Sequence, residues 1–397
     1  MKLLIALFVA AALPARVWIP LGPFRSFSYL DLVIVWCLFS LLTRLMNNKR
    51  FVIGDPWILL YLSIPFGLSQ LSFNWTESPT ETFRAVSVYL EALIAYLTVT
   101  VYLDGRTQAE MFRIANIFIL TTLTACVLML LGVPGFAPQL IGNPTADDYI
   151  AYFVRLSHPF LGRSNNLAGI LAIFIFPYAT YAWSRKSPFL KAMTVLIALA
   201  LLLTMSRGVL LAVALIAFMM MLTSSAAFAR LLIWTGMTGP IVAAATTWVL
   251  TAVPIAAQYI GDRFTTKNID ARSGIMDAAI YRIAERPLLG YGAGAIGLVD
   301  GRLREGAHNT YLEQILAFGM PLGILCSLSL IMIAVRLRKI ANNTGDKAMT
   351  GAWLAPACQL LIVMTEAAFE GSILRIIYYM TIAWIVSLLR ASPQTRS

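Results

Sequence analysis

Arg207 interrupts a long apolar run, and its type and position suggest chemistry. The stretch from Leu202 to Phe218 reads LLTMSRGVLLAVALIAF, and Arg207 is the only charged residue between Lys191 and Arg230. A charged side chain within such a run is costly, so a functional role is its default hypothesis. The planar guanidinium donates hydrogen bonds in a fixed fork that suits carboxylate and phosphate. The alternative is that Arg207 extends to lipid headgroups.

The residues around Arg207 predict a turn between two apolar helices. Ser187-Pro188 supplies an N-cap and a first helical residue. The helix from Phe189 to Leu203 would rise only about 22 Å, against about 30 Å of hydrocarbon. We therefore expect the turn at 206–208 below the outer membrane surface, with Gly208 allowing the chain to turn. The amides that begin the next helix would favour an anion there.

His308 is the second candidate, in the stretch GAHNTYLEQILAFGMPLG (306–323). Thr310 and Glu313 have the spacing of a capping box, and we prefer that role for Glu313 to catalysis. His308 would then lie just outside a helix N-terminus, whose dipole disfavours imidazolium. A neutral imidazole beside arginines suits a general base. The alternative is a histidine satisfied at a loop–helix junction. His158, which precedes a proline, is a weaker candidate.

The elements that must position these residues are membrane helices. Hydrophobic residues make up 59% of the 397-residue chain and charged residues 12%, about half the charged share of soluble proteins. We expect an all-α, polytopic integral membrane protein, with residues 1–397 forming one domain of about 12 helices. The expected spans are 3–21, 29–46, 55–72, 83–103, 109–131, 165–183, 189–204, 208–224, 230–253, 309–335, 350–367 and 373–390. The first resembles a signal peptide but is interpreted as an uncleaved span.

No group of residues has the spacing of metal ligands, so we expect neither a metal nor another cofactor. The four cysteines lie in separate apolar runs and are interpreted as packing residues. The glycine-rich GYGAG (290–294) follows no predicted strand, so it is interpreted as a tight outer loop rather than a dinucleotide fingerprint.

Basic residues predict the orientation. With the N-terminus inside, six of the seven lysines fall inside and only Lys267 falls outside. Arginines behave differently, because ten of them lie outside or near the outer face. These are Arg155, Arg163, Arg207, Arg263, Arg272, Arg282, Arg286, Arg302, Arg304 and Arg375. We interpret the outer face as an anion-binding surface, with Arg286 among its candidate diphosphate ligands. The alternative is that long outer loops escape the topology rule and their arginines pair with nearby acids.

Two outer loops are long, at about 132–164 and 254–308. The second contains SGIMDAAIYRIAERP, which predicts an amphipathic helix that begins at Ser273 as N-cap and ends at Pro287. Its expected apolar face consists of Ile275, Met276, Ala279, Ile280 and Ile283. Such a helix would lie on the membrane or cover a cavity.

Several stretches together resemble the O-antigen ligase and polymerase superfamily of bacterial membrane glycosyltransferases. They are TMSRGVLLA (204–212), the segment 271–295, AHNTYLEQILAFGMPLG (307–323) and LGRSNNLAGILAIFIFP (161–177). The resemblance is densest at 196–335, a core region that includes the periplasmic loop 254–308. One stretch departs from the family pattern, because many relatives have a proline between the two asparagines of GRSNN.

The resemblance implies a GT-C-like fold and a metal-independent, inverting glycosyltransferase. The donor would be a glycan on undecaprenyl diphosphate, transferred to a lipid A–core acceptor on the periplasmic side of the bacterial inner membrane. Arg207 matches the family's SRG arginine and His308 its HN histidine. Arg163 and Arg272 match further arginine positions. The resemblance implies that the arginines hold the diphosphate and that the histidine acts as general base, with lipids and no nucleic acid as partners.

Three alternatives remain open on the sequence. A polymerase would join lipid-linked repeats into O-antigen or exopolysaccharide with the same motifs. A transporter or flippase of lipid-linked glycans would also use arginines and a central cavity, but it would place polar residues at several depths. The polar residues here gather on one face, which favours an enzyme. The last alternative is a non-catalytic assembly scaffold.

Overall fold

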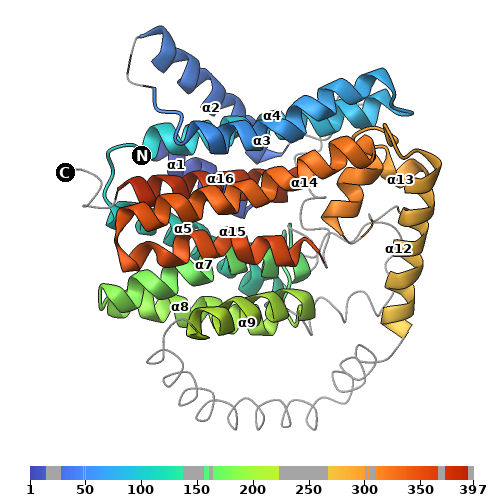
Figure 1. Cartoon of the computed structure of the whole chain (residues 1–397). Coiled ribbons are helices and arrows are strands. Elements are labelled where there is room, and N and C mark those ends of the chain that lie inside the picture. Colours follow the sequence, from blue (N-terminus) through green and yellow to red (C-terminus); the bar gives the residue numbers. More distant parts are fainter. Residues whose placement is uncertain are drawn as a thin grey trace.

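The computed structural model describes residues 1–14, 28–47, 49, 51–136, 156–160, 164–222, 267–299, 303, 307, 309–364 and 372–391. Within them the chain is helical (Figure 1). The described helices are α1 (Lys2–Ala12), α2 (Tyr29–Met46), α3 (Pro56–Leu71), α4 (Pro79–Leu103), α5 (Gln108–Leu130), α7 (Ser164–Ser184), α8 (Pro188–Leu203), α9 (Arg207–Leu222), α12 (Lys267–Glu285), α13 (Ile296–Val299), α14 (Thr310–Thr344), α15 (Thr350–Ile362) and α16 (Ser372–Arg390), with short 3₁₀ turns at Ser72–Asn74 and Lys347–Met349.

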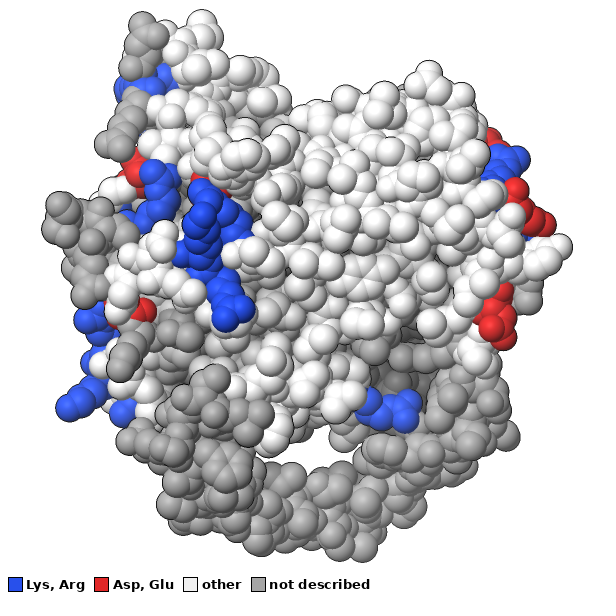
Figure 2. Space-filling model, viewed as in Figure 1, with Lys and Arg blue, Asp and Glu red and all other residues white. Residues whose placement is uncertain are grey.

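The described helices confirm the predicted membrane spans. Seven are long and apolar enough to cross a membrane, and four shorter apolar helices lie at other predicted spans. The span expected at 230–253 lies outside the described residues. Figure 2 shows charged side chains gathered mainly at two ends of the molecule, with a broad uncharged band between them. A multi-pass membrane protein has this distribution, because lipid surrounds the uncharged band.

Several helices begin at side chains that satisfy their first free amides. Ser28 and Asp31 form a capping box at the start of α2, and Thr107 and Glu110 form another at α5. The predicted N-cap Ser187 accepts a hydrogen bond from the amide of Leu190. These caps fix where each helix starts after a short connection.

The interior of the bundle is built around α16, which packs on α4 and also contacts α14 and α15. Of the residues from Ile373 to Arg390 in α16, 83% are buried. The Trp384 ring is fully buried and packs edge to face on Phe112, 5.5 Å between centroids. Its indole Nε1 donates to the carbonyl oxygen of Met111 at 3.0 Å. The burial of most of its residues places α16 at the centre of the bundle.

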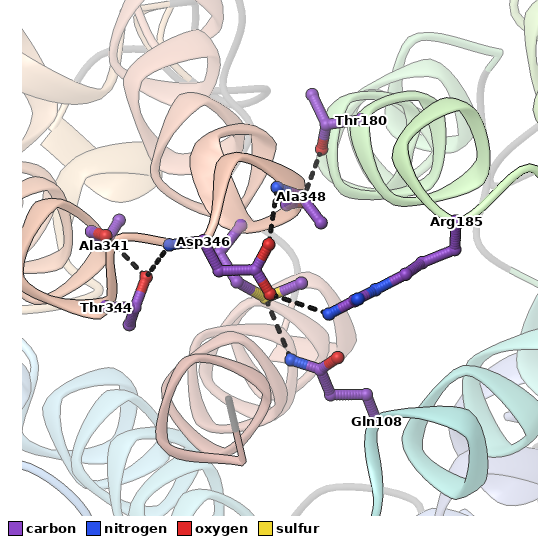
Figure 3. Close-up of polar contacts among 8 residues, drawn as sticks. Gln108, Thr180, Arg185, Ala341, Thr344, Asp346 and Ala348 are labelled. Carbon is purple, nitrogen blue, oxygen red and sulfur yellow. Dashed lines mark hydrogen bonds and ion pairs between the residues drawn. The ribbon is translucent and has the colours of Figure 1, made fainter. Parts of the chain in front are cut away.

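The helix order gives the molecule two distinct faces. We call the face at which α1 begins and α16 ends the inner face, and the opposite face the outer face (Figure 1). On the inner face, Arg185 of α7 pairs with Asp346 at 2.9 Å, in the connection between α14 and α15 (Figure 3). Nε and Nη2 of Arg336, in α14, donate hydrogen bonds to the carboxylate of Asp55, the N-cap of α3. These pairs join helices that are distant in sequence.

Helix α12 confirms the predicted amphipathic helix but corrects its details. It runs across the outer ends of the membrane helices (Figure 1). It begins at Lys267, so Ser273 lies within the helix and is not its N-cap. Ala278 and Ala279 are buried, whereas the exposed fractions of Met276 and Ile280 are 39% and 55%. Ile275 and Ile283, which were predicted on the apolar face, are partly buried against the same cluster as these alanines. The face toward the protein therefore keeps Ile275, Ala279 and Ile283 from the prediction, whereas Met276 and Ile280 face outward.

Helix α14 also departs from the single span expected at 309–335. Gly319 has φ 77° and ψ 170°, so the helix is interrupted there. Figure 1 shows a short first part of α14 turned away from the long part and lying near α12; α12 and α14 are in contact. The long part runs from Met320 to the inner face. The break places the first part of α14 on the outer face, where it forms a wall of the candidate site.

Candidate functional site at the outer face

Helices α9 and α14 both pack on α15. Each of them begins at the outer face, where α15 ends. The amide of Thr310, the first residue of α14, donates to the carbonyl oxygen of Val363 at 2.9 Å, one residue beyond α15. The fold thus directs the starts of the helices that carry the SRG and HN motifs to the outer end of one helix.

Arg207 is the first residue of α9 and its side chain is exposed. The 16 residues of α8 rise roughly 24 Å, which is less than the hydrocarbon thickness, as predicted. The turn itself differs from the prediction, because Met205 adopts the left-handed φ of 50° and Gly208 lies within α9. The amide of Leu156 donates to the carbonyl oxygen of Leu203 at 2.9 Å, so the loop before α7 supports this turn.

Three other predicted site residues, Arg163, Arg272 and His308, lie wholly or partly outside the described residues. Arg163 and His308 lie outside the described residues. Arg272 lies in the first part of α12, but its side chain is outside the described part of the structure. The roles of these three residues therefore stay predictions.

The start of α14 corrects the predicted capping box. The N-cap is Asn309, whose side chain accepts hydrogen bonds from the amides of Tyr311 and Leu312 at 3.0 and 3.2 Å. Thr310 is instead the first helical residue. Glu313, which is 6% exposed, accepts a hydrogen bond from the amide of Ala307 at 3.1 Å. Its carboxylate thus binds the backbone just before the helix, next to the HN motif.

Arg286 lies one residue beyond the end of α12 and already has a carboxylate partner. It pairs with Glu77, and its guanidinium carbon lies 4.8 Å from the centroid of the Tyr291 ring. Fourteen residues separate it from Arg272, which is roughly 21 Å along a helix. The backbones of Arg272 and Arg286 therefore lie at different places on the outer face.

The surroundings of His158 indicate a structural role. Its side chain is fully buried and its Nδ1 accepts a hydrogen bond from the amide of Phe160 at 3.2 Å. Burial lowers the pKa of His158 to about 3, despite an opposing hydrogen bond with the backbone of Ala12. A neutral histidine held in this way joins the loop before α7 to the end of α1.

The predicted glycine loop at 290–294 packs tightly between α4 and the break in α14. Gly290, Gly292 and Gly294 all have left-handed φ angles, and an added Cβ on any of them would overlap neighbouring atoms. The amides of Tyr291 and Gly292 donate to the carbonyl oxygens of Leu316 and Ala317 at 2.8 and 2.9 Å. The loop therefore satisfies carbonyl groups that the break at Gly319 leaves without helical partners.

This loop and four helices, α4, α13, α14 and α16, line an outer cavity of about 430 Å³. Polar groups in its wall come from α4 (Glu81), α14 (Glu313 and Gln314) and α16 (Arg375), beside the ring of Tyr89. The guanidinium carbon of Arg375 lies 4.5 Å from the centroid of that ring. Within the described part of the chain, Nε of Arg375 is buried and has no hydrogen-bond partner.

Sequence reasoning placed Arg375 near the outer face but did not assign it to a site. The only signal was its position in the first turn of the last apolar span. The cavity is formed by segments from four distant parts of the chain, so local spacing could not reveal it. A size of about 430 Å³ lies within the range of small-molecule sites.

Comparison with known proteins agrees with the motifs. Residues 192–327 match the family model described as O-antigen ligase. The matched segment runs from α8 into α14 and contains Arg207, Arg272, Arg286 and His308. No curated protein matches the chain. Members of the matched family are glycosyltransferase-like enzymes that act on lipid-linked glycans. Residues 192–327 are therefore similar to the O-antigen ligase family, and the multi-pass helical fold of the described residues agrees with the resemblance of the motifs to the O-antigen ligase and polymerase superfamily.

Proposed function

We propose that this protein transfers a glycan from undecaprenyl diphosphate to a lipid A–core acceptor on the periplasmic side of the bacterial inner membrane. The observation that carries the proposal is Arg207, which begins α9 within the O-antigen ligase segment. Helix α14, which follows the HN motif, packs on the same helix α15 as α9. An arginine and a histidine motif directed to one face supply an anion ligand and a proton acceptor.

Arg207 combines two features that favour a diphosphate. Its guanidinium can donate a bidentate pair of hydrogen bonds to phosphate oxygens. The start of α9 also carries the positive end of the helix dipole, which favours an anion. In our proposal Arg272 and Arg163 complete the clamp. Fixed donors of this kind stabilise the charge that develops as the glycosyl–phosphate bond breaks, so the proposed reaction is metal-independent.

His308 takes the proton in the proposed reaction. The acceptor hydroxyl attacks the anomeric carbon from the side opposite the diphosphate, so the configuration inverts. A glycosidic C–O bond forms while the bond to the diphosphate breaks, and undecaprenyl diphosphate leaves with its electron pair. His308 accepts the hydroxyl proton during attack. Glu313, bound to the backbone at Ala307, fixes the chain next to His308.

Arg286 has a secondary role in this proposal. Its guanidinium is paired with Glu77, so binding a diphosphate would require that partner to be displaced. Its distance along α12 from Arg272 makes joint binding of one diphosphate unfavourable. We therefore propose that Arg286 binds a more distant part of the donor and contributes less to the rate than Arg207.

Purified protein incubated with lipid-linked glycan and candidate acceptors tests the function. Transfer of the glycan to lipid A–core, read as product size, is the expected result. A ladder of lengthened lipid-linked glycans would instead identify a polymerase. Movement of lipid-linked glycan across a vesicle membrane without any bond change would identify a transporter and overturn the proposal.

The pH–rate profile of His308 variants tests the proton acceptor. His308→Ala should slow transfer about 10²–10⁴-fold, the usual effect of general-base catalysis, and should remove the acidic limb of the profile. Donor affinity should change little, because arginines hold the donor. If His308 only donated a hydrogen bond, His308→Gln would restore much of the rate. A fully active His308→Gln enzyme with its acidic limb intact would rule out the base.

A further inference from the structure

The outer cavity is a polar site at the end of an apolar bundle, separate from Arg207. Its walls come from α4, α13, α14, α16 and the glycine loop, whereas Arg207 begins α9 beside α15. Ten residues of helix, or about 15 Å, separate Tyr89 from Pro79 at the outer start of α4. The cavity therefore reaches from the outer surface well into the bundle.

The two carboxylates in the cavity wall already have partners. Glu81 pairs with Arg84, and Glu313 accepts a hydrogen bond from the amide of Ala307. Arg375 differs, because its buried Nε lacks a hydrogen-bond partner within the described part of the chain. A buried donor left unsatisfied costs roughly 1–3 kcal/mol. The arrangement therefore favours a ligand that accepts a hydrogen bond from Arg375.

The chemistry of the wall indicates a neutral sugar rather than an anion. A free phosphate would lie near two carboxylates, and like charges repel. Sugar hydroxyls both accept and donate, so they can pair with Arg375 and with the oxygens of Glu313 and Gln314. The apolar remainder of the wall, which includes the Tyr89 and Phe318 rings, suits the C–H faces of a pyranose.

We propose that this outer cavity is a saccharide-binding site and that Arg375 is its main hydrogen-bond donor. The proposal rests on the proposed glycan transfer, because it assigns a neutral sugar residue of one substrate to the cavity. That residue comes from either the donor glycan or the core acceptor, which share this chemistry. The site holds the glycan at a distance from the diphosphate, so it positions substrate without taking part in bond formation.

Binding of glycans that lack the diphosphate tests this proposal independently of transfer. The probes are the oligosaccharide released from the lipid-linked donor by mild acid and the core oligosaccharide released from the acceptor lipid. Saturation-transfer NMR titration of each against the full-length protein gives its Kd. We expect one probe to bind, and Arg375→Gln to weaken it about 10-fold to 100-fold, the loss expected for a hydrogen bond to a charged group.

Two further variants keep the test valid if Arg375→Gln fails to fold. Leu298 lines the cavity but is 69% exposed, so Leu298→Trp should obstruct the cavity without disturbing the core. Leu288→Trp, at a leucine that is equally exposed but does not line the cavity, should leave binding intact. The matched arginine control is Arg282→Gln, since Arg282 already pairs with Glu285 at 2.8 Å on the outer face.

The outcomes separate this inference from the proposed function. Weaker binding in Arg375→Gln and Leu298→Trp, with both controls normal, would support the saccharide site. The saccharide site would be ruled out if the wild-type protein bound neither probe. It would also be ruled out if Arg375→Gln and Leu298→Trp bound the probes as tightly as the wild type. If the wild-type protein still transferred glycan in either of these cases, the proposed function would stand.

Discussion

At the scale of single residues, geometry of the donor matters more than charge alone. Arg207→Lys keeps the positive charge at the start of α9 but removes the bidentate fork. We expect the variant to insert normally and to lose about 10²–10³-fold in transfer rate, the usual effect of removing one preorganised donor. Rates of lipid-linked glycan transfer by the purified variant measure this loss.

The matched variant is Arg286→Lys, because Arg286 pairs with Glu77. It should lose much less activity than Arg207→Lys. A near-normal rate for Arg207→Lys would reduce Arg207 to a residue that contacts lipid headgroups and would remove the main support for the diphosphate site.

His158 predicts a pH dependence of stability. Burial holds its folded pKa at about 3, below the ordinary value of 6.5. Between these values the unfolded chain binds a proton that the folded chain does not, so stability falls as pH drops below about 6.5. One such proton changes the unfolding free energy by up to about 1.4 kcal/mol per pH unit.

The measurement is Tm in detergent between pH 7.5 and 5.5. We expect the decrease on acidification to be smaller in His158→Gln, which stays uncharged throughout, than in the wild type. Equal slopes for the two proteins would mean that His158 does not contribute to acid sensitivity.

Candidate site residues could be predicted from the sequence only where a local pattern marked them. The apolar run around Arg207 made that residue conspicuous without any structure. Arg375 also lies in a predicted apolar span, but its place in a site depends on the glycine loop and α14 meeting α4 and α16. Those contacts join positions more than 200 residues apart, as in the hydrogen bond from Thr82 to the carbonyl oxygen of Ala293.

At the scale of elements, length and hydropathy predicted helices better than their exact ends. The predicted span 29–46 coincides with α2, and α5 differs from its prediction by one residue at each end. Helix starts were less certain because two adjacent residues can both act as caps. Asn309 caps α14 in place of Thr310, since an asparagine side chain reaches the same amides.

The break in α14 was not predicted, because a glycine within an apolar run is also compatible with a continuous helix. Gly319 takes a left-handed φ of 77° only because the glycine loop supplies donors to the freed carbonyl groups. The pairing of these two segments is a tertiary property. It follows that the loop and the break stabilise each other.

Gly290→Ala tests this mutual support. Gly290 has φ 66° and an added Cβ would overlap the carbonyl of Leu316. We expect the free energy of unfolding to fall by well over the ~1–2 kcal/mol that left-handed backbone strain alone would cost. The loss should appear as a lower Tm and as weaker saccharide binding in the adjoining cavity.

The control is Gly67→Ala in the middle of α3, where an added Cβ has no neighbour within 4 Å. Helix propensity predicts a small gain there, about 1 kcal/mol at most. A Gly290→Ala protein as stable as Gly67→Ala would show that the loop does not need its left-handed glycine.

At the scale of the whole molecule, both ends of the described chain belong to one face. Met1 precedes α1 at the inner face and α16 ends there at Arg390 (Figure 1). Arg185, Arg336 and Asp346 join helices at that face, which holds the connections richest in lysine. Charge distribution therefore predicts that the inner face is cytoplasmic and that α12 lies in the periplasm.

Cysteine labelling in intact cells tests this orientation. The four native cysteines are buried, so their background reaction with a membrane-impermeant maleimide should be low. Lys267→Cys, at the start of α12, should react from outside. Lys347→Cys, in the connection before α15, should react only after the cells are opened. The two positions bracket the bundle from opposite faces, so each serves as the control for the other. Reaction of position 347 in intact cells would reverse the orientation and would move Arg207 and the outer cavity to the cytoplasmic side, away from a periplasmic acceptor.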